Sequence, residues 1–321
     1  MKKNSKTQIG LGLAALGRPE YINIRTDNSI DKSEEAFKKN TFSVLNEAYK
    51  LGVRYFDTAP SYGKGEAFLQ EWNDVNNHSD VVLGTKWGYT YVANWELGFE
   101  GKHEVKEHSL KKLVEQWQVS KQMLPKLKYY QVHSATFESG ILENETVLNQ
   151  LSQIKKETGL HIGITTSGSN QKEVIVAALK VSVENELLFD SFQVTYNIFE
   201  QSTFSILEAI LKQGKKVIIK EALANGRVFQ NENFQHYSEA YKILNQLSKK
   251  YEVGFDAIAL RFVMDSLQPT YVLSGASNKL QLTQNLKALN FSFTLEELEL
   301  LKASQVNPEL YWTERGFLLW N

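Results

Sequence analysis

Four side chains that can hold or move a proton follow short runs of β-forming residues in this sequence. Asp57 and Tyr62 lie in the segment VRYFDTAPSYGKG, residues 53–65, which changes from β-formers to a loop at Asp57. Lys86 ends the run VVLGTK, and His133 ends the run YYQVH. If these runs are parallel neighbouring strands, the four side chains meet at the carboxyl end of one sheet. Open α/β sheets and barrels place their chemistry there.

These four residue types could form a proton relay. A tyrosine hydroxyl has an ordinary pKa of about 10, so a nearby cation is expected to make Tyr62 more acidic. Lys86 could supply that ammonium, and Asp57 would keep it charged. A neutral His133 could donate a hydrogen bond to a carbonyl oxygen while Tyr62 protonates that oxygen. Each residue alone has a structural explanation, but four of them leaving three strands together favour catalysis.

The elements that must position these residues alternate regularly along the chain. Eight short β-forming runs are predicted as strands, at residues 8–14, 53–56, 81–85, 129–132, 161–164, 191–195, 216–219 and 271–273. Amphipathic stretches follow them and are predicted as helices, at residues 33–50, 66–73, 105–123, 142–157, 171–181, 202–213, 236–251 and 278–289. Eight such repeats predict a single (β/α)₈ barrel domain over residues 1–321.

Further segments lie outside this regular alternation. Residues 256–265 are predicted as an extra helix, and residues 295–303 as a terminal helix whose capping box is formed by Thr294 and Glu297. Two connections, residues 87–104 and 222–235, are too long for plain turns and leave the predicted catalytic face.

Composition excludes several classes of function. The chain has 321 residues, 42% of them hydrophobic, and a net charge of -1, so no nucleic-acid partner is expected. It has no cysteine, which excludes disulfides and cysteine-based metal sites and is compatible with a cytoplasmic location. No metal is expected. No run approaches the ~20 apolar residues of a membrane span, so no membrane partner is expected.

The sequence FDTAPSYG, with the strand-terminal Lys86 and His133, resembles the Asp-Tyr-Lys-His tetrad of the aldo-keto reductase family. The resemblance extends from Ile9 to about Asn285. It implies a nicotinamide-dependent oxidoreductase that interconverts a small carbonyl compound and an alcohol by hydride transfer, with Tyr62 as the general acid or base.

The resemblance also implies a cofactor site. Family members hold the nicotinamide with a Ser-Asn pair after the fifth strand, where this chain has Thr165 and Thr166, and with a Gln that matches Gln193. Lys220 replaces an aromatic residue that usually stacks on the nicotinamide. The remaining positions are Asp57, the loop residues Leu223, Gly226 and Arg227, and the adenosine-phosphate segment with Gly275, Ala276, Gln281 and Asn285.

The resemblance to the family also indicates which dinucleotide binds. Gln281 stands where an Arg often binds the 2′-phosphate, and Lys279 is a possible substitute. The resemblance implies NADP, and NAD is not excluded.

The substrate side is expected to be walled by aromatic and basic residues. Trp87 begins the long connection after the third strand, and Tyr311, Trp312 and Arg315 belong to a predicted C-terminal tail. Two other functions stay open. One is a nucleotide-binding regulatory protein with little turnover, and the other is a barrel aldolase that uses Lys86 to form a Schiff base.

Overall fold

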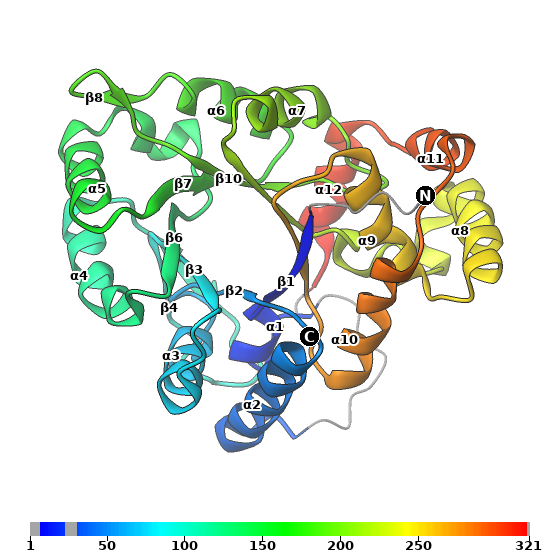
Figure 1. Cartoon of the computed structure of the whole chain (residues 1–321), viewed down its shortest axis with the longest axis horizontal. Helices are drawn as coiled ribbons and strands as arrows, with labels where there is room; N and C mark the ends of the chain where they lie inside the picture. The colour runs from blue at the N-terminus through cyan, green and yellow to red at the C-terminus, as the bar shows by residue number, and fades with distance from the viewer. Residues whose placement is uncertain (1–6, 23–30, 320–321) are drawn as a thin grey trace.

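The computed structural model describes residues 7–22 and 31–319. Eight parallel strands close into a barrel in the order β1, β12, β11, β10, β7, β6, β3 and β2 (Figure 1). These strands are β1 Gln8–Gly12, β2 Tyr55–Asp57, β3 Val82–Trp87, β6 Leu127–Val132, β7 His161–Thr165, β10 Ser191–Thr195, β11 Lys216–Lys220 and β12 Tyr271–Ser274. All eight predicted strands are present, and the (β/α)₈ barrel is confirmed.

Helices surround the barrel on its outside (Figure 1). They are α1 Ala14–Gly17, α2 Glu34–Lys50, α3 Gly65–Asn76, α4 Leu110–Ser120, α5 Glu145–Thr158, α6 Gln171–Ala178, α7 Phe204–Lys212, α8 Ser238–Tyr251, α9 Phe255–Ser266, α10 Lys279–Leu286, α11 Leu295–Lys302 and α12 Pro308–Phe317. The predicted extra helix is α9. The predicted capping box begins α11, where the side chains of Thr294 and Glu297 each accept a hydrogen bond from the other's backbone N–H.

One predicted helix beside the barrel begins later than expected, and two hairpins around the barrel were not predicted. The helix predicted to begin at residue 105 begins at Leu110, because Ser109 caps it by accepting a hydrogen bond from the Lys112 N–H. Val105 instead belongs to a hairpin of β4 Tyr89–Tyr91 and β5 Glu104–Lys106. A second hairpin pairs β8 Ser182–Val183 with β9 Glu186–Leu187.

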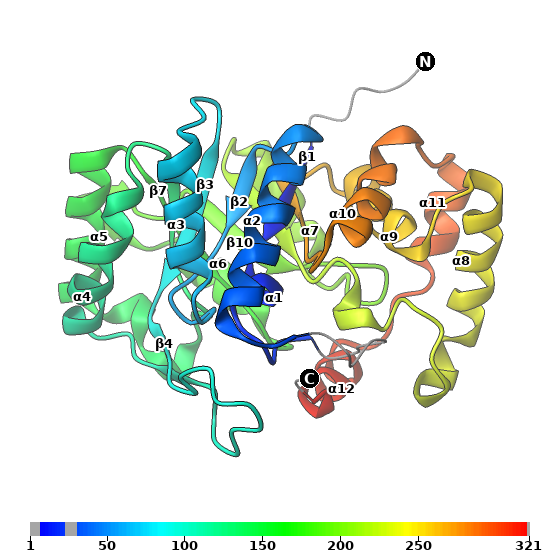
Figure 2. The same cartoon turned by 90° about the horizontal axis from the view of Figure 1, so that it is seen from below.

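The C-terminal segment, predicted as a tail, forms the helix α12. Asn307 caps it through its side chain and Pro308 occupies the first turn, which is a sequence signal for a helix start that the prediction missed. Figure 2 shows α12 and β4 at the same end of the barrel. The strands also end on this side, so both segments lie near their carboxyl ends.

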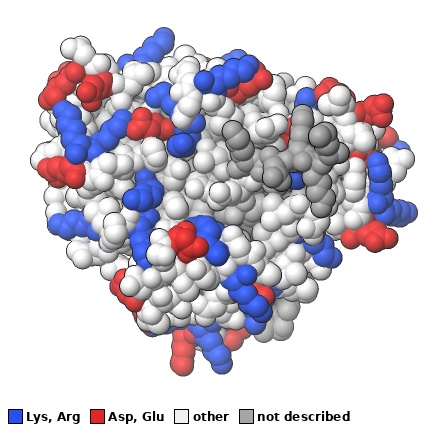
Figure 3. All heavy atoms as spheres, viewed as in Figure 1, with Lys and Arg blue, Asp and Glu red and all other residues white. Residues whose placement is uncertain are grey.

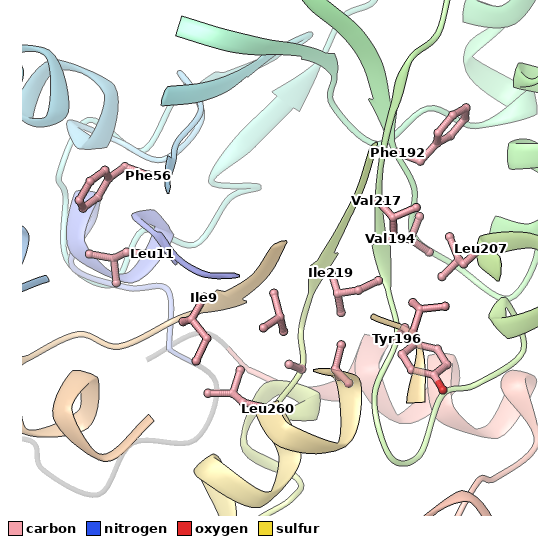
Figure 4. Close-up of a cluster of buried hydrophobic side chains, with 14 of the residues drawn as sticks. Ile9, Leu11, Phe56, Phe192, Val194, Tyr196, Leu207, Val217, Ile219 and Leu260 are labelled. Carbon is pink, nitrogen blue, oxygen red and sulfur yellow. The ribbon is translucent and has the colours of Figure 1, made fainter. Parts of the chain in front are cut away.

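Alternate residues of the strands serve two different cores. Val217 and Ile219 of β11 face the helices, in a large cluster that includes Ile9 and Leu260 (Figure 4). Ile218, between them, belongs to a smaller cluster with Tyr55, Tyr129, Tyr271 and Leu273. This alternation follows from the two-residue period of a strand, and the smaller cluster fills the barrel interior.

Glycines make room for the interior tyrosines. A Cβ atom at Gly10 would lie 2.6 Å from Cδ1 of Tyr55, and one at Gly84 would collide with the Tyr55 hydroxyl group. The Tyr55 ring therefore crosses the interior between these strands and stacks on Tyr271, with ring centres 4.1 Å apart. This packing places the Tyr55 hydroxyl beside Asp57, at the start of the candidate site.

Charged side chains of both signs are interspersed over the face seen in Figure 3. Among the described residues, no helix has both the length and the apolar character needed to cross a membrane.

Candidate active site

Asp57, the last residue of β2, is a buried carboxylate surrounded by hydrogen-bond donors. The Tyr55 hydroxyl donates to its Oδ1 at 3.1 Å, and the Gln193 side-chain amide donates to the same oxygen at 2.9 Å. Nζ of Lys86, from β3, forms an ion pair with Oδ2. Asp57 is 2% exposed and Lys86 is fully buried. Removing either charge would leave the other without compensation, so the two residues form one electrostatic unit.

Tyr62 lies in the turn between β2 and α3, and tight backbone packing fixes this turn. Gly63 has a φ of +61°, which disfavours other residues. A Cβ atom at Gly63 would also lie 2.5 Å from the carbonyl oxygen of Gly17, which accepts a hydrogen bond from the Lys64 N–H at 2.8 Å. These contacts hold the Tyr62 turn against α1.

Lys86 contacts the face of the Tyr62 ring. Its Nζ lies 4.9 Å from the ring centre, and the hydrogen bonds it makes among the described residues go to Asp57 and to the Thr58 carbonyl oxygen. Burial raises the pKa of the Tyr62 phenol well above its ordinary value, and the Asp57 and Glu104 carboxylates add to the increase. Burial therefore outweighs the net lowering of the Tyr62 pKa that was expected from a nearby cation.

His133 follows β6 and stays neutral at physiological pH. Burial lowers the pKa of its imidazole well below the ordinary value, and the ammonium groups of Lys86 and Lys220 lower it further. Its Nδ1 lies 3.4 Å from the Ser61 hydroxyl oxygen, and its ring centre lies 5.6 Å from that of Tyr62. A neutral imidazole carries one N–H and can donate a hydrogen bond, as the sequence predicted.

Three of the four predicted catalytic residues, Asp57, Tyr62 and His133, line one cavity of ≈ 370 Å³, and the fully buried Lys86 is paired with Asp57. This volume is within the range of small-molecule sites. The predicted cofactor residues that also line it are Gln193, Lys220, Leu223, Gly226, Gly275, Ala276, Gln281 and Asn285, and the predicted substrate residue that lines it is Arg315.

The other two predicted cofactor residues do not line this cavity. Oγ1 of Thr165 accepts a hydrogen bond from the Ser134 N–H at 2.7 Å. Arg227 is fully buried and donates from Nη1 to the Tyr311 carbonyl oxygen and to Glu314, both at 3.0 Å. Its guanidinium carbon lies 3.9 Å from the centre of the Tyr311 ring. Arg227 therefore fastens α12 to the loop after β11 and is not directed at a pyrophosphate.

Three predicted substrate residues are likewise structural. Trp87 is fully buried in the helix-side core, and its ring makes a T-shaped contact with that of His108. Tyr311 is fully buried, and its hydroxyl accepts a hydrogen bond from Asn197 at 2.9 Å. Trp312 packs against the same core. Among the described residues, none of these three lines the ≈ 370 Å³ cavity, so they are not part of the proposed substrate site.

Several cavity residues were not predicted as site residues. Glu221 has a φ of +54° and pairs with Arg315, whose Nε lies 3.3 Å from Oε1 of Glu221. Glu104 approaches from the β4–β5 hairpin, Tyr21 follows α1, and Asp256 lies in the first turn of α9. Of these four residues, only Glu221 could have been suspected from the sequence, because it directly follows the predicted site residue Lys220. The other three reach the cavity through tertiary folding.

A second cavity of ≈ 550 Å³ is larger, but these groups do not line it. It is bounded by residues of α2, α3, α4 and β4, among them Glu34, Glu66 and Gln116, and by the connections that carry Gly63 and Trp95. None of the four predicted catalytic residues lines it. We assign the candidate active site to the smaller cavity, because three of the four predicted catalytic residues line it and the fourth is paired with one of them.

The residues of the smaller cavity are compatible with a nicotinamide dinucleotide. Nε2 of Gln193 donates hydrogen bonds to Asp57 and Gln131. Its Oε1 accepts no hydrogen bond from the described residues and could accept one from a carboxamide. At the other end, a Cβ atom at Gly275 would meet nothing within 4 Å, which leaves open space at the start of α10.

The chain belongs to the aldo/keto reductase family of oxidoreductases, whose sequence model matches residues 8–305. It is 26% identical over 298 residues to the uncharacterized oxidoreductase YqkF of Bacillus subtilis, covering 87% of this chain and 92% of that protein. It is 22% identical over 322 residues to the NADH-specific methylglyoxal reductase of Escherichia coli, covering 92% and 94%.

Solved structures share the same fold. The holo form of the aldo-keto reductase AKR11C1 from Bacillus halodurans superposes with a TM-score of 0.68 at 21% identity, covering 93% of this chain and 92% of that chain. The glycerol dehydrogenase AKR11B4 from Gluconobacter oxydans gives a TM-score of 0.70 at 18% identity, covering 92% and 90%.

Proposed function

We propose that this protein is a nicotinamide-dependent carbonyl reductase or alcohol dehydrogenase in which Asp57, Tyr62, Lys86 and His133 form the catalytic group. The observation that carries this proposal is that Tyr62 and His133 line one cavity beside the buried Lys86–Asp57 ion pair. When bound, a reduced nicotinamide supplies the hydride. Tyr62 supplies the proton, so that a carbonyl group gains one hydride and one proton and becomes an alcohol.

The electrostatics of the site suit proton donation. The raised pKa of Tyr62 keeps its phenol protonated at neutral pH, which is the form a proton donor needs. As the proton leaves, negative charge develops on the ring, and the Lys86 ammonium 4.9 Å from the ring centre stabilises that charge. The neutral His133 orients the carbonyl oxygen through its N–H. The Lys86 charge therefore acts mainly in the transition state.

For the cofactor we propose NADH in preference to NADPH, against the choice that family habit suggested. A 2′-phosphate needs cationic partners, and the described cationic residues lining the cavity are Lys220 and Arg315, which do not belong to the α10 segment. Lys279, the possible substitute named from the sequence, begins α10 but does not line the cavity. At α10, Oε1 of Gln281 accepts hydrogen bonds from the backbone N–H and the hydroxyl of Ser277. Asp256 adds a carboxylate to the lining. The NADH-specific relative in Escherichia coli supports the same choice.

The test is a titration of the purified protein with NADH and NADPH by fluorescence, followed by turnover assays with a panel of aldehydes and ketones. We expect tighter binding of NADH and oxidation of NADH by several carbonyl compounds. Tight dinucleotide binding without turnover on a wide panel would refute the enzymatic proposal and favour a nucleotide-binding regulatory protein. Equal or tighter binding of NADPH would refute the cofactor assignment alone.

A further inference from the structure

The Lys220 side chain lines the candidate active site with an unused hydrogen-bond donor. Its Nζ donates to Oγ1 of Thr195 at 2.8 Å and to Oγ of Ser167 at 3.0 Å. An ammonium group has three donors, and the third has no hydrogen-bond partner among the described residues. Because the side chain lines the cavity, this donor is available to a ligand.

The positive charge of Lys220 is only weakly compensated. The nearest described carboxylate is that of Glu221, whose Oε1 lies 3.9 Å from Nζ, which is beyond hydrogen-bond distance. That same oxygen accepts hydrogen bonds from Nε and Nη2 of Arg315 at 3.3 and 3.4 Å. The Lys220 side chain is only 17% exposed, and a largely desolvated ammonium without a closely paired carboxylate is costly, so an anion placed beside it would be stabilised.

Lys220 is also close enough to the catalytic residues to act on a substrate. Lys220 and His133 line the same cavity, and the ammonium of Lys220 is one of the charges that lower the pKa of His133. Ser134 and Ser167, which follow β6 and β7, line the cavity as well, and β7 lies between β6 and the strand β10 that adjoins β11. His133 and Lys220 therefore bound one continuous wall.

We propose that Lys220 binds an anionic group of the carbonyl substrate, so that the substrate class is oxo acids and phosphorylated aldehydes or ketones. This inference rests on the proposed function and names the substrate class of the same site. The pyrophosphate of the dinucleotide is also an anion and could bind Lys220 instead of the substrate. We assign it to the substrate because Lys220 shares its wall of the cavity with His133, which orients the carbonyl.

The first test compares matched substrates in Lys220→Met and in a control, Lys216→Met, which removes the same charge at the opposite end of β11. The pairs are succinic semialdehyde against butanal, and 4-formylbenzoate against 4-formylbenzamide. We expect Lys220→Met to lower kcat/KM at least ~30-fold for the anionic member of at least one pair and less than ~3-fold for its neutral member. Lys216→Met should change neither. Equal losses for both members of both pairs would overturn the proposal.

A second measurement separates the two possible sources of the anion. If Lys220 bound the pyrophosphate, Lys220→Met would weaken NADH binding by ~30-fold or more, and that result would also overturn the proposal. We expect the fluorescence titration to give an NADH Kd within about threefold of the wild type. Lys220→Arg, which retains the charge, should recover at least part of the activity on the anionic substrates. This recovery also shows that the loss does not come from misfolding.

The third measurement needs no turnover. Benzoate and benzamide have similar size and cannot accept hydride, so their binding is followed by calorimetry with the wild type and both methionine variants. We expect benzoate to bind more tightly than benzamide to the wild type and to lose this advantage in Lys220→Met. If no carbonyl compound is reduced but this pattern holds, the proposed reaction fails and the anion site stands. If the advantage is absent or persists without Lys220, the anion site fails whether or not the enzyme is active.

Discussion

Nζ of Lys86 lies over the ring of Tyr62, 4.9 Å from its centre, while its ion pair is made with Asp57. This arrangement places a fixed positive charge next to a phenol that burial keeps protonated. The Lys86 ammonium stabilises the Tyr62 phenolate as the proton is transferred. Replacing Tyr62 and Lys86 in turn separates this role from the structural role of the same ion pair.

Replacing Tyr62 by Phe removes the proposed proton donor without changing the shape of the ring. We expect the rate of carbonyl reduction to fall by roughly 10²- to 10⁴-fold, the usual contribution of a general acid. The Kd for NADH should stay within about twofold, because the hydroxyl group has no proposed role in cofactor binding. Steady-state kinetics and a fluorescence titration measure the two quantities. Tyr49→Phe, on the outer helix α2, is the control and should behave like the wild type. Undiminished turnover in Tyr62→Phe would remove this residue from the mechanism.

Replacing Lys86 by Met leaves the Asp57 carboxylate buried without its partner. We expect the free energy of unfolding to fall by about 3–5 kcal/mol, as in other broken buried ion pairs. The double variant Lys86→Met with Asp57→Asn should recover most of that stability but none of the activity. Urea denaturation of the wild type, the two single variants and the double variant gives the coupling energy. Additive losses would mean that the two charges do not depend on each other.

The eight strands and the carboxyl-end location of the four proposed catalytic residues could be predicted from the sequence, because both follow from short-range patterns. β-forming runs and amphipathic stretches alternate, and Asp57, Lys86 and His133 each stand at or next to the end of a run. Arg227, Trp87 and Tyr311 were misjudged for another reason. Their residue types suit ligand binding, but Trp87 points to the helix side because it alternates with Lys86 along β3, and the packing of α12 on the barrel places Tyr311 and Arg227.

The direction of the Tyr62 pKa shift could not be read from the sequence either. It depends on how deeply the ring is buried and on Glu104, which reaches the site from a hairpin that was not predicted.

The stability of the protein should depend on pH through His108. Burial first, and the Lys106 ammonium second, lower its pKa to about 4 from an ordinary value of 6.5. Between these two values the unfolded chain binds a proton that the folded chain does not, so folding loses stability as the pH falls through this window. The loss amounts to ~1.4 kcal/mol per pH unit from this group. It is absent above the unfolded pKa.

Urea unfolding between pH 8 and pH 4 tests this dependence. His133, whose pKa is also lowered, contributes in the same direction, so the slope should become shallower in His108→Gln without disappearing. Unfolding at pH 8 serves as the reference for any effect that is independent of protonation. An unchanged slope in the variant would show that His108 is not buried as a neutral group.

Introducing an arginine at Gln281 should shift the cofactor preference. A guanidinium at this position, which lines the cavity at α10, can form charge-assisted hydrogen bonds with a 2′-phosphate. We expect the ratio of the Kd for NADPH to the Kd for NADH to fall by ~10-fold or more. Gln284→Arg, on the same helix but outside the described lining of the cavity, should leave the ratio unchanged. Comparable shifts in both variants would indicate a general charge effect and not a local contact.

Helix α12 makes part of the active site modular. It follows all eight strands in the chain, yet it brings Arg315 into the cavity, and contacts of the buried Arg227 with Glu314 and of the buried Asn197 with Tyr311 fasten it to the barrel. Exchanging residues 308–317 together with these partners would therefore change the Arg315 side of the cavity while leaving the barrel and its buried ion pair intact. For protein engineers this helix is a compact segment C-terminal to the last strand, into which sequence diversity can be introduced.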